Sequence, residues 1–440
     1  MKERPERGLQ EALIRYFKLE DHGTNIRTEL IAGATTFLSM AYITVVNPSI
    51  LSETGMDFGA VFVATCIAAA VGSLIMGVWA NYPVAQAPGM GQNAFFTYTV
   101  VLGMGYTWES ALGAVFVSGI FFVILSILPV REWLVNAIPR NMKLGISAGI
   151  GLFLGFIALK NAGVVVDHPA TFVSLGELST AGPFLCLGGF VLIAALAARK
   201  IRGAVIIGML VATAAGLGMG AAEYQGLISM PPSAAPVMLK LDIVSVLDIS
   251  LVTVVLTMLL VDVFDTAGTL VGVANRAGLA DAEGRLPRLG RALMSDSTAT
   301  VVGALAGTSS TTSYIESAAG VETGGRTGLT AVTVAVLFLL CLFLAPLAQT
   351  IPAYATAAAL LFVACLMARS LADVDWEDMT ESAPAVVCAL GMPLSFSIAD
   401  GIGLGFITYV MIKALSGRGA ECPVAVYLIA AVFLGKFAFL

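Results

Sequence analysis

Long apolar runs recur along the whole chain and are separated by short polar segments. Fourteen of these runs have the length of a helix, or of an interrupted helix, that crosses a membrane. They cover residues 30–48, 60–80, 86–103, 110–129, 141–160, 182–198, 204–222, 245–273, 292–306, 308–321, 328–349, 353–369, 382–397 and 399–416. A last apolar stretch, 424–440, is compatible with a further span or with a helix at the interface. The pattern predicts an all-α polytopic membrane protein with about fourteen spans.

The composition agrees with this pattern and excludes several classes of protein. Hydrophobic residues make up 58% of the 440 positions and charged residues only 12%, whereas soluble domains carry roughly 25% charged residues. The loops are too short to form a soluble catalytic domain. The net charge of −6 gives no basic surface for nucleic acid. The six cysteines and two histidines have no disulfide or metal-site spacing, so we expect neither a metal nor a cofactor.

The basic residues indicate the orientation in the membrane. When the fourteen runs are counted as crossings, all Lys and Arg except Lys160, Lys240 and Lys436 fall on one side, which is 20 of the 23. The positive-inside rule makes that side cytoplasmic. We therefore expect a multi-pass protein of the cell membrane, the plasma or inner membrane, with a cytoplasmic N-terminus.

The chain also contains a weak internal repeat. Residues 111–117 match residues 328–334 at an offset of 217, and both segments lead to an Ile-Pro pair. Chance similarity among Ala, Val and Leu is the alternative explanation. The offset places the two matching segments seven membrane crossings apart. Because seven is an odd number, the second copy has the opposite orientation in the membrane, as in many transporters. The predicted order is a cytoplasmic tail (1–29), a first seven-span repeat (30–223), a second seven-span repeat (245–418) and an apolar C-terminal tail (419–440).

Two spans at corresponding positions of the repeat are interrupted. Span three begins with Pro88 and Gly89, which break a helix, and Asn93 brings an amide to membrane depth. Span ten begins with a polar extended segment, 307–313, before a short helix. Interrupted backbone at this depth must be buried in protein or line a cavity. The alternative for span ten is a capping box from Ser313 to Glu316, in which Glu316 serves only its own helix.

Span eight carries two aspartates, Asp262 and Asp265, one turn apart. A mid-bilayer Asp costs about 2.5–3.5 kcal/mol on the insertion scale, and such residues normally mark a substrate or proton route. Asp265 is favoured because Gly268 and Thr269 leave space on the next turn. The alternative is that neighbouring hydroxyl groups donate hydrogen bonds to these carboxylates, which then have only a structural role. This alternative is stronger for Asp262 than for Asp265. Since these central segments contain no Lys or Arg, the carboxylates either take up a proton or cation or accept hydrogen bonds from a neutral ligand.

Three segments together resemble one transporter family. They are 88–94 in span three, 265–269 in span eight and 311–317 in span ten. They resemble the nucleobase/ascorbate transporter superfamily, in its AzgA-like purine permease branch. The resemblance implies a core domain of spans 1–4 and 8–11 and a gate domain of spans 5–7 and 12–14. It also implies proton-coupled uptake of hypoxanthine, adenine and guanine, by an elevator-like or rocking motion of core against gate.

The resemblance and the chemistry of a purine together define a candidate site. By motif, Asp265 and Glu316 resemble the two acids that hold the base, and Asn93 resembles the polar contact from span three. Phe95 or Tyr314 is suited to cover the flat face of a heteroaromatic ligand, with ordinary helix packing as the alternative. The candidate substrate-binding residues are Asn93, Ala94, Phe95, Asp265, Thr269, Tyr314, Glu316 and Ser317. Asp265 and Glu316 are also the candidates for proton coupling.

Other functions remain open at this stage. An anion permease of the same architecture is one alternative, although two acids disfavour an anionic ligand. An intramembrane acid/base hydrolase using Asp265 and Glu316 is another, and a channel is weaker because no filter motif is present. The expected partners are a purine nucleobase, protons and the lipid bilayer. A homodimer is an open possibility, and no nucleic acid is expected.

Overall fold

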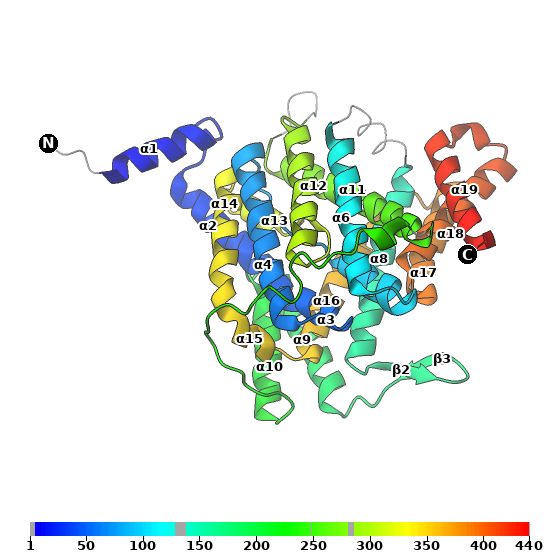
Figure 1. Cartoon of the computed structure of the whole chain (residues 1–440), viewed down its shortest axis with the longest axis horizontal. Helices are drawn as coiled ribbons and strands as arrows, with labels where there is room; N and C mark the ends of the chain where they lie inside the picture. The colour runs from blue at the N-terminus through cyan, green and yellow to red at the C-terminus, as the bar shows by residue number, and fades with distance from the viewer. Residues whose placement is uncertain (1–4, 128–137, 248, 280–285, 440) are drawn as a thin grey trace.

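The computed structural model describes all of the chain except residues 1–4, 128–137, 248, 280–285 and 440 (Figure 1). The elements of the first half are α1 (Pro5–Phe17), α2 (Ile26–Met40), α3 (Ile43–Ser52), α4 (Phe58–Ile75), η1 (Met76–Ala80), β1 (Gln86–Pro88), α5 (Met90–Ala94), η2 (Phe95–Gly103), α6 (Trp108–Ile127), α8 (Arg140–Asn161), β2 (Val165–His168), β3 (Phe172–Leu175), α9 (Ala181–Ala198) and α10 (Ala204–Gly218). Those of the second half are η3 (Val244–Leu247), α11 (Ile249–Arg276), α12 (Leu289–Ala306), β4 (Thr311–Ser313), α13 (Ser317–Glu322), α14 (Gly328–Cys341), η4 (Leu342–Leu344), α15 (Ala345–Thr350), α16 (Ala353–Ala368), η5 (Arg369–Asp373), α17 (Met379–Ser395), α18 (Ile398–Leu415), η6 (Gly419–Glu421) and α19 (Val424–Phe439).

Each predicted apolar run coincides with helical structure. Nine helices in the described part of the chain are long and apolar enough to cross a membrane. The all-α membrane architecture is therefore confirmed, as are the extended segments and half-helices predicted for spans three and ten. The number of fourteen spans stays a prediction. Four residues that entered the charge count lie outside the described residues: Lys2, Arg4, Arg131 and Arg285.

Two elements were not anticipated from the pattern. The predicted N-terminal tail contains α1, and the first apolar helix begins at Ile26 because the Asn25 side chain accepts a hydrogen bond from the Thr28 N–H and caps it. The loop between α8 and α9 forms a hairpin in which β2 pairs antiparallel with β3. In Figure 1 this hairpin lies at the opposite end of the helical bundle from α1.

The helices pack in two groups. Group A contains α2, α3, α4, α5, η2, α6, α11, α12, α13 and α14, and group B contains α8, α9, α10, α16, α17 and α18. Contacts are dense within each group and sparse between them, where the main meeting points are α3 with α16, α5 with α8, η2 with α18 and α2 with α10. Each group draws helices from both halves of the sequence.

The two ends of the bundle differ in their residues. We call one end the basic end, where α8 begins at Arg140 and α11 ends at Arg276. The opposite end, where α3 ends at Ser52 and α8 ends at Asn161, is called the far end. The β2–β3 hairpin follows α8 and therefore lies at the far end (Figure 1).

Buried polar contacts at the basic end join segments that are distant in sequence. The fully buried Glu29 carboxylate on α2 accepts the backbone N–H groups of Arg326, Thr327 and Thr330, at 2.9 to 3.3 Å, and so caps the start of α14. A negative charge at a helix N-terminus is stabilising. This carboxylate therefore fixes α14 against α2.

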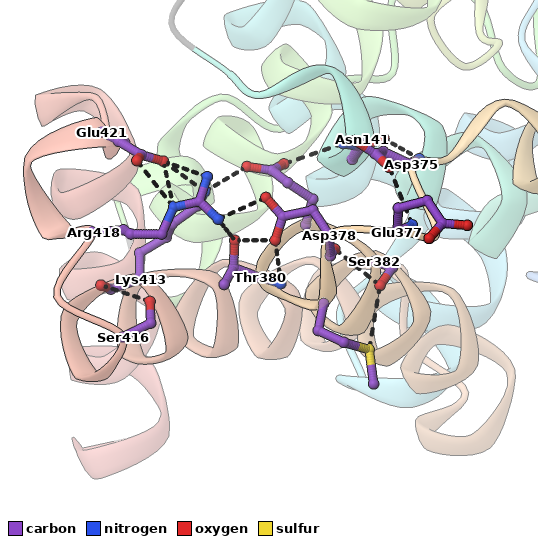
Figure 2. A network of polar contacts seen from close by, with 12 residues as sticks. Asn141, Asp375, Glu377, Asp378, Thr380, Ser382, Lys413, Ser416, Arg418 and Glu421 are labelled. Atoms are coloured by element: carbon purple, nitrogen blue, oxygen red, sulfur yellow. Dashed lines mark hydrogen bonds and ion pairs between the residues drawn. The ribbon is translucent and has the colours of Figure 1, made fainter.

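In group B, Lys413 of α18 is 1% exposed and forms ion pairs with Glu381 at 2.8 Å and Glu421 at 3.1 Å. Arg418 joins the same network through Asp378, at 2.7 Å, and through Glu421 (Figure 2). The network ties the start of α17 to the end of α18 and to the segment before α19. A buried ammonium ion is tolerated there because carboxylates surround it.

Close helix packing depends on glycine at one position above all. A Cβ atom on Gly328 would lie 1.9 Å from the carbonyl oxygen of Gly77, and a Cβ atom on Gly77 would lie 2.5 Å from that of Gly328. The two backbones are in direct contact where η1 meets α14. Such close approach is how helices associate in a bilayer, where no hydrophobic drive exists between them.

We predict that Gly328→Ala destabilises the protein by about 1–3 kcal/mol, because the added methyl group forces the two backbones apart. The matched control is Gly188→Ala, where a Cβ atom has nothing within 4 Å. Thermal melting of the purified protein in detergent measures both variants. Equal melting temperatures for the two variants would show that the contact between Gly328 and Gly77 is not tight.

A second prediction concerns Asp378, whose pKa is lowered to about 2 by hydrogen bonds from the Thr380 hydroxyl and the Arg418 guanidinium. A lowered pKa in the folded state stabilises the protein above the ordinary value of 3.8, and this stabilisation is lost as the pH falls toward about 2. We expect Asp378→Asn to lower the melting temperature at neutral pH and to have a shrinking effect between about pH 4 and pH 2. A difference in melting temperature that does not change with pH would contradict this.

Candidate functional site

The two interrupted spans meet as a pair of short strands. β1 and β4 are antiparallel, with Gln86 opposite Ser313 and Pro88 opposite Thr311, and all six of their residues are buried. The Gly89 N–H donates to the Ser310 carbonyl at 2.9 Å and extends the pairing. β1 leads into α5 at Met90 and β4 leads into α13 at Ser317, and the first N–H groups of each helix have no partner within the helix. Because the strands are antiparallel, the two helices begin at opposite ends of the strand pair.

A buried carboxylate anchors this strand pair. Asp296 of α12 is fully buried and accepts hydrogen bonds from Gln86 of β1 at 2.9 Å, Ser313 of β4 at 2.8 Å and Thr266 of α11 at 2.5 Å. One side chain thus connects both strands to two helices. The sequence analysis did not single out Asp296. It lies inside the apolar run 292–306, so the rule that selected Asp262 could have found it.

Glu316 lies at the start of α13, and its side chain reaches the segment between α2 and α3. Its carboxylate accepts a hydrogen bond from the Tyr42 hydroxyl at 2.6 Å. The side chain makes no capping hydrogen bond to α13, and Ser313 donates to Asp296 instead of capping the helix. The capping-box alternative for Glu316 is therefore wrong. Tyr42 was missed by the sequence analysis, since a tyrosine inside an apolar run carries no distinguishing signal.

The two aspartates of α11 have different surroundings. Asp265 is exposed and accepts only a long hydrogen bond from Thr312, at 3.4 Å. Asp262 is fully buried, and one of its oxygens accepts from the Thr300 hydroxyl at 3.1 Å. Among the described residues, neither Asp265 nor Glu316 forms an ion pair with Lys or Arg.

Asn93 presents an unsatisfied donor. Its side-chain oxygen accepts a hydrogen bond from the Ser309 hydroxyl, while its side-chain nitrogen is buried and has no partner among the described residues. The amide of the neighbouring Gln92 is likewise buried and unpartnered. A buried polar group left without a partner costs about 1–3 kcal/mol. An unfilled donor beside the crossing strands is the kind of group that a polar ligand satisfies.

The other predicted site residues lie around the same strand pair, and several have structural partners. The Tyr314 hydroxyl donates to the Pro88 carbonyl at 2.5 Å, and the Ser317 hydroxyl accepts from the Ala85 N–H at 3.0 Å. Ala94 and Phe95 are buried in the core, and Thr269 is 8% exposed. These contacts position the strands, and the part of these residues in ligand binding stays a prediction.

The face of α11 that carries Asp265 is exposed toward the basic end and buried toward the far end. On the face that carries Asp265, Gly268 and Asn275 are also exposed, and these positions lead to the basic end. On the same face toward the far end, Met258, Val254 and Leu251 are buried. Polar groups such as Asp265 and Asn275 at membrane depth normally face a water-filled path and not lipid. We infer from these exposed polar positions that a polar crevice runs along α11 from Asp265 to the basic end.

A bundle of long apolar helices in which two interrupted segments pair at their extended stretches is typical of a membrane transporter. The chain belongs to the Permease family, the nucleobase/ascorbate transporter family, whose sequence pattern matches residues 27–404. It is a permease and not an enzyme, so the alternative of an intramembrane hydrolase is wrong.

Relatives with known names match the chain over nearly its full length. A putative permease of Methanocaldococcus jannaschii is 52% identical, over 97% of this chain and 98% of its own. The adenine permease AdeP of Escherichia coli is 49% identical, over 98% of this chain and 97% of its own. The guanine/hypoxanthine permease PbuO of Bacillus subtilis is 44% identical, over 95% of this chain and 98% of its own.

Solved structures share the fold at low sequence identity. The transmembrane domain of the cyanobacterial bicarbonate transporter BicA has a TM-score of 0.62 at 15% identity, covering 86% of this chain and 97% of its own. The murine anion transporter Slc26a9 in the inward-facing state has a TM-score of 0.64 at 10% identity, covering 88% of this chain and 68% of its own. These similarities establish the fold of the chain and do not bear on its ligand.

Proposed function

We propose that this permease imports purine nucleobases together with protons. The observation that carries the proposal is that two carboxylates, Asp265 and Glu316, lie around the paired strands together with the Asn93 side-chain nitrogen, which has no partner among the described residues. Carboxylates accept the N–H groups on the edge of a purine, and an amide N–H₂ donates to its ring nitrogens or carbonyl. Relatives named as adenine and guanine/hypoxanthine permeases support the substrate class.

An anion is a poorer ligand for this crevice, although the fold is shared with a bicarbonate and an anion transporter. Two carboxylates without a paired Lys or Arg among the described residues repel a negative charge. A neutral heteroaromatic base carries no such penalty. The anion permease is therefore the second candidate and rests on the fold alone.

We assign group A to the core domain and group B to the gate domain, and we place the basic end in the cytoplasm of the cell, at the plasma or inner membrane. The sparse contacts between the groups support a motion of core against gate. The segregation of Lys and Arg supports the orientation, including a cytoplasmic N-terminus. In this arrangement the crevice faces the cytoplasm.

The first test of the site is Glu316→Gln. We expect it to reduce purine uptake at least about tenfold, because the amide offers a donor where the base needs an acceptor and one polar contact is left unsatisfied. Uptake of radiolabelled adenine, guanine and hypoxanthine into cells or vesicles is the measurement. Glu322→Gln is the matched control, since Glu322 lies on the same short helix but is exposed, with only a 3.7 Å contact to Arg276. Uptake reduced equally in both variants would remove Glu316 from the site.

The second test concerns coupling, in which we assign proton exchange chiefly to Asp265. We expect an inward pH gradient to raise purine accumulation, a protonophore to abolish it and a sodium gradient to have little effect. In Asp265→Asn, gradient-driven accumulation should fail while exchange of purine across the membrane persists, since exchange needs no net proton movement. Asp167→Asn, in the exposed hairpin, is the control. Full gradient-driven accumulation of purine in Asp265→Asn would show that a group other than Asp265 exchanges the proton.

A further inference from the structure

The far end of the crevice is closed where groups A and B meet. Tyr98 of η2 is 1% exposed, and its hydroxyl donates to Glu53, at the end of α3, at 2.6 Å. Asn161, at the end of α8, reaches this pair from group B. Its side-chain nitrogen donates to the Glu53 carboxylate at 2.9 Å and to the Tyr98 hydroxyl at 3.1 Å. The three side chains form a hydrogen-bonded bridge between the two groups.

An aromatic cluster lies directly behind this bridge. The Tyr98 ring packs edge-on against Phe153 of α8, with centroids 6.4 Å apart, and against Phe396, at 5.9 Å. Phe396 joins α17 to α18 in a left-handed conformation and also contacts Phe156 at 6.0 Å. Lys160 lies 5.1 Å from the centre of the Phe396 ring. The Tyr98 ring of group A thus packs against two rings of group B, Phe153 and Phe396, and Phe156 contacts Phe396 in turn.

The bridge and the cluster together explain why the crevice is accessible from one end only. The Tyr98 ring is 1% exposed and packs between group A and group B, and Asn161 donates a hydrogen bond to the Tyr98 hydroxyl. The face of α11 is correspondingly buried from Leu251 to Met258.

We propose that Glu53, Tyr98 and Asn161 form a latch that holds the transporter closed at the far end and that must open for the site to face that side. The proposal rests on the transport function proposed above. It assigns these residues a positioning role between the two groups, away from the ligand.

The chemistry of the latch suits a contact that opens and closes repeatedly. Glu53 and Asn161 are exposed, so water can replace their hydrogen bonds when the groups separate. Exposed polar contacts of this kind contribute little net free energy. The aromatic rings exclude water while the latch is closed, and the polar bridge determines how the groups fit together.

The latch can be tested with a cysteine reporter in the crevice. Gly268 is exposed on the Asp265 face of α11, and a Cβ atom there meets nothing within 4 Å, so Gly268→Cys fits without strain. Cys365, the exposed native cysteine, is changed to Ser; the other five are buried. A membrane-impermeant thiol reagent is then applied to intact cells, and the rate of labelling at position 268 reports opening at the far end.

Asn161→Asp is the decisive variant, because it removes both hydrogen bonds and places a carboxylate beside Glu53. We expect labelling from outside to rise about fivefold, which corresponds to a loss of about 1 kcal/mol from the closed state. Tyr98→Phe keeps the ring but removes the hydroxyl and should give a smaller rise. Ser179→Asp is the matched control, since it adds the same charge in an exposed loop next to α9.

Unchanged labelling in both Asn161→Asp and Tyr98→Phe would overturn the latch, and so would an equal rise in Ser179→Asp. Labelling needs no purine, so these outcomes are independent of the substrate assignment. If the parent chain takes up no purine but Asn161→Asp still raises labelling, the proposed function fails and the latch stands. Should Asn161→Asp not reach the membrane, Asn161→Leu removes the same hydrogen bonds without adding charge.

Discussion

The structure depends on how a broken backbone is satisfied inside a membrane. A helix that stops at mid-depth leaves N–H and C=O groups without partners, and lipid offers none. Here β1 and β4 satisfy each other, and the Tyr314 N–H extends the pairing to the Ala85 carbonyl at 2.9 Å. Because the two strands come from opposite halves of the chain, neither half can form this centre alone. The pairing therefore joins the two halves and creates the polar region in one step.

This constraint explains why polar side chains gather around the strands. Asp296 holds one strand through Gln86 and the other through Ser313, while Thr300 of the same helix donates to the Thr311 carbonyl at 3.0 Å. These groups serve the backbone and are satisfied. Around the same centre, Asp265 accepts a long hydrogen bond, and the Asn93 side-chain nitrogen has no partner among the described residues. The contrast distinguishes side chains that build the centre from those that the proposed function assigns to the ligand.

Much of this arrangement could be predicted from the sequence, for reasons that are local. Pro88 and Gly89 break a helix wherever they occur, and Asp265 is costly in any apolar helix, so both stood out without knowledge of the fold. The repeat offset indicated that the two interrupted spans correspond. Tyr42 could not be identified in this way, because its role is created by a partner, Glu316, 274 residues away. The same holds for Asn161, whose hydrogen bond to Glu53 spans 108 residues.

The two acids of the candidate site, Glu316 and Asp265, have different surroundings. The difference supports a binding role for Glu316 and a coupling role for Asp265 in the proposed function. Glu316 is held by the short hydrogen bond from Tyr42 and lies at the start of α13, where a helix N-terminus favours negative charge. A carboxylate fixed in this way is a good acceptor for the N–H groups of a base. Asp265 has only the long contact to Thr312 and opens to the crevice, so a proton can reach it from water. In the proposed function, binding and coupling therefore fall on different helices, α13 for Glu316 and α11 for Asp265.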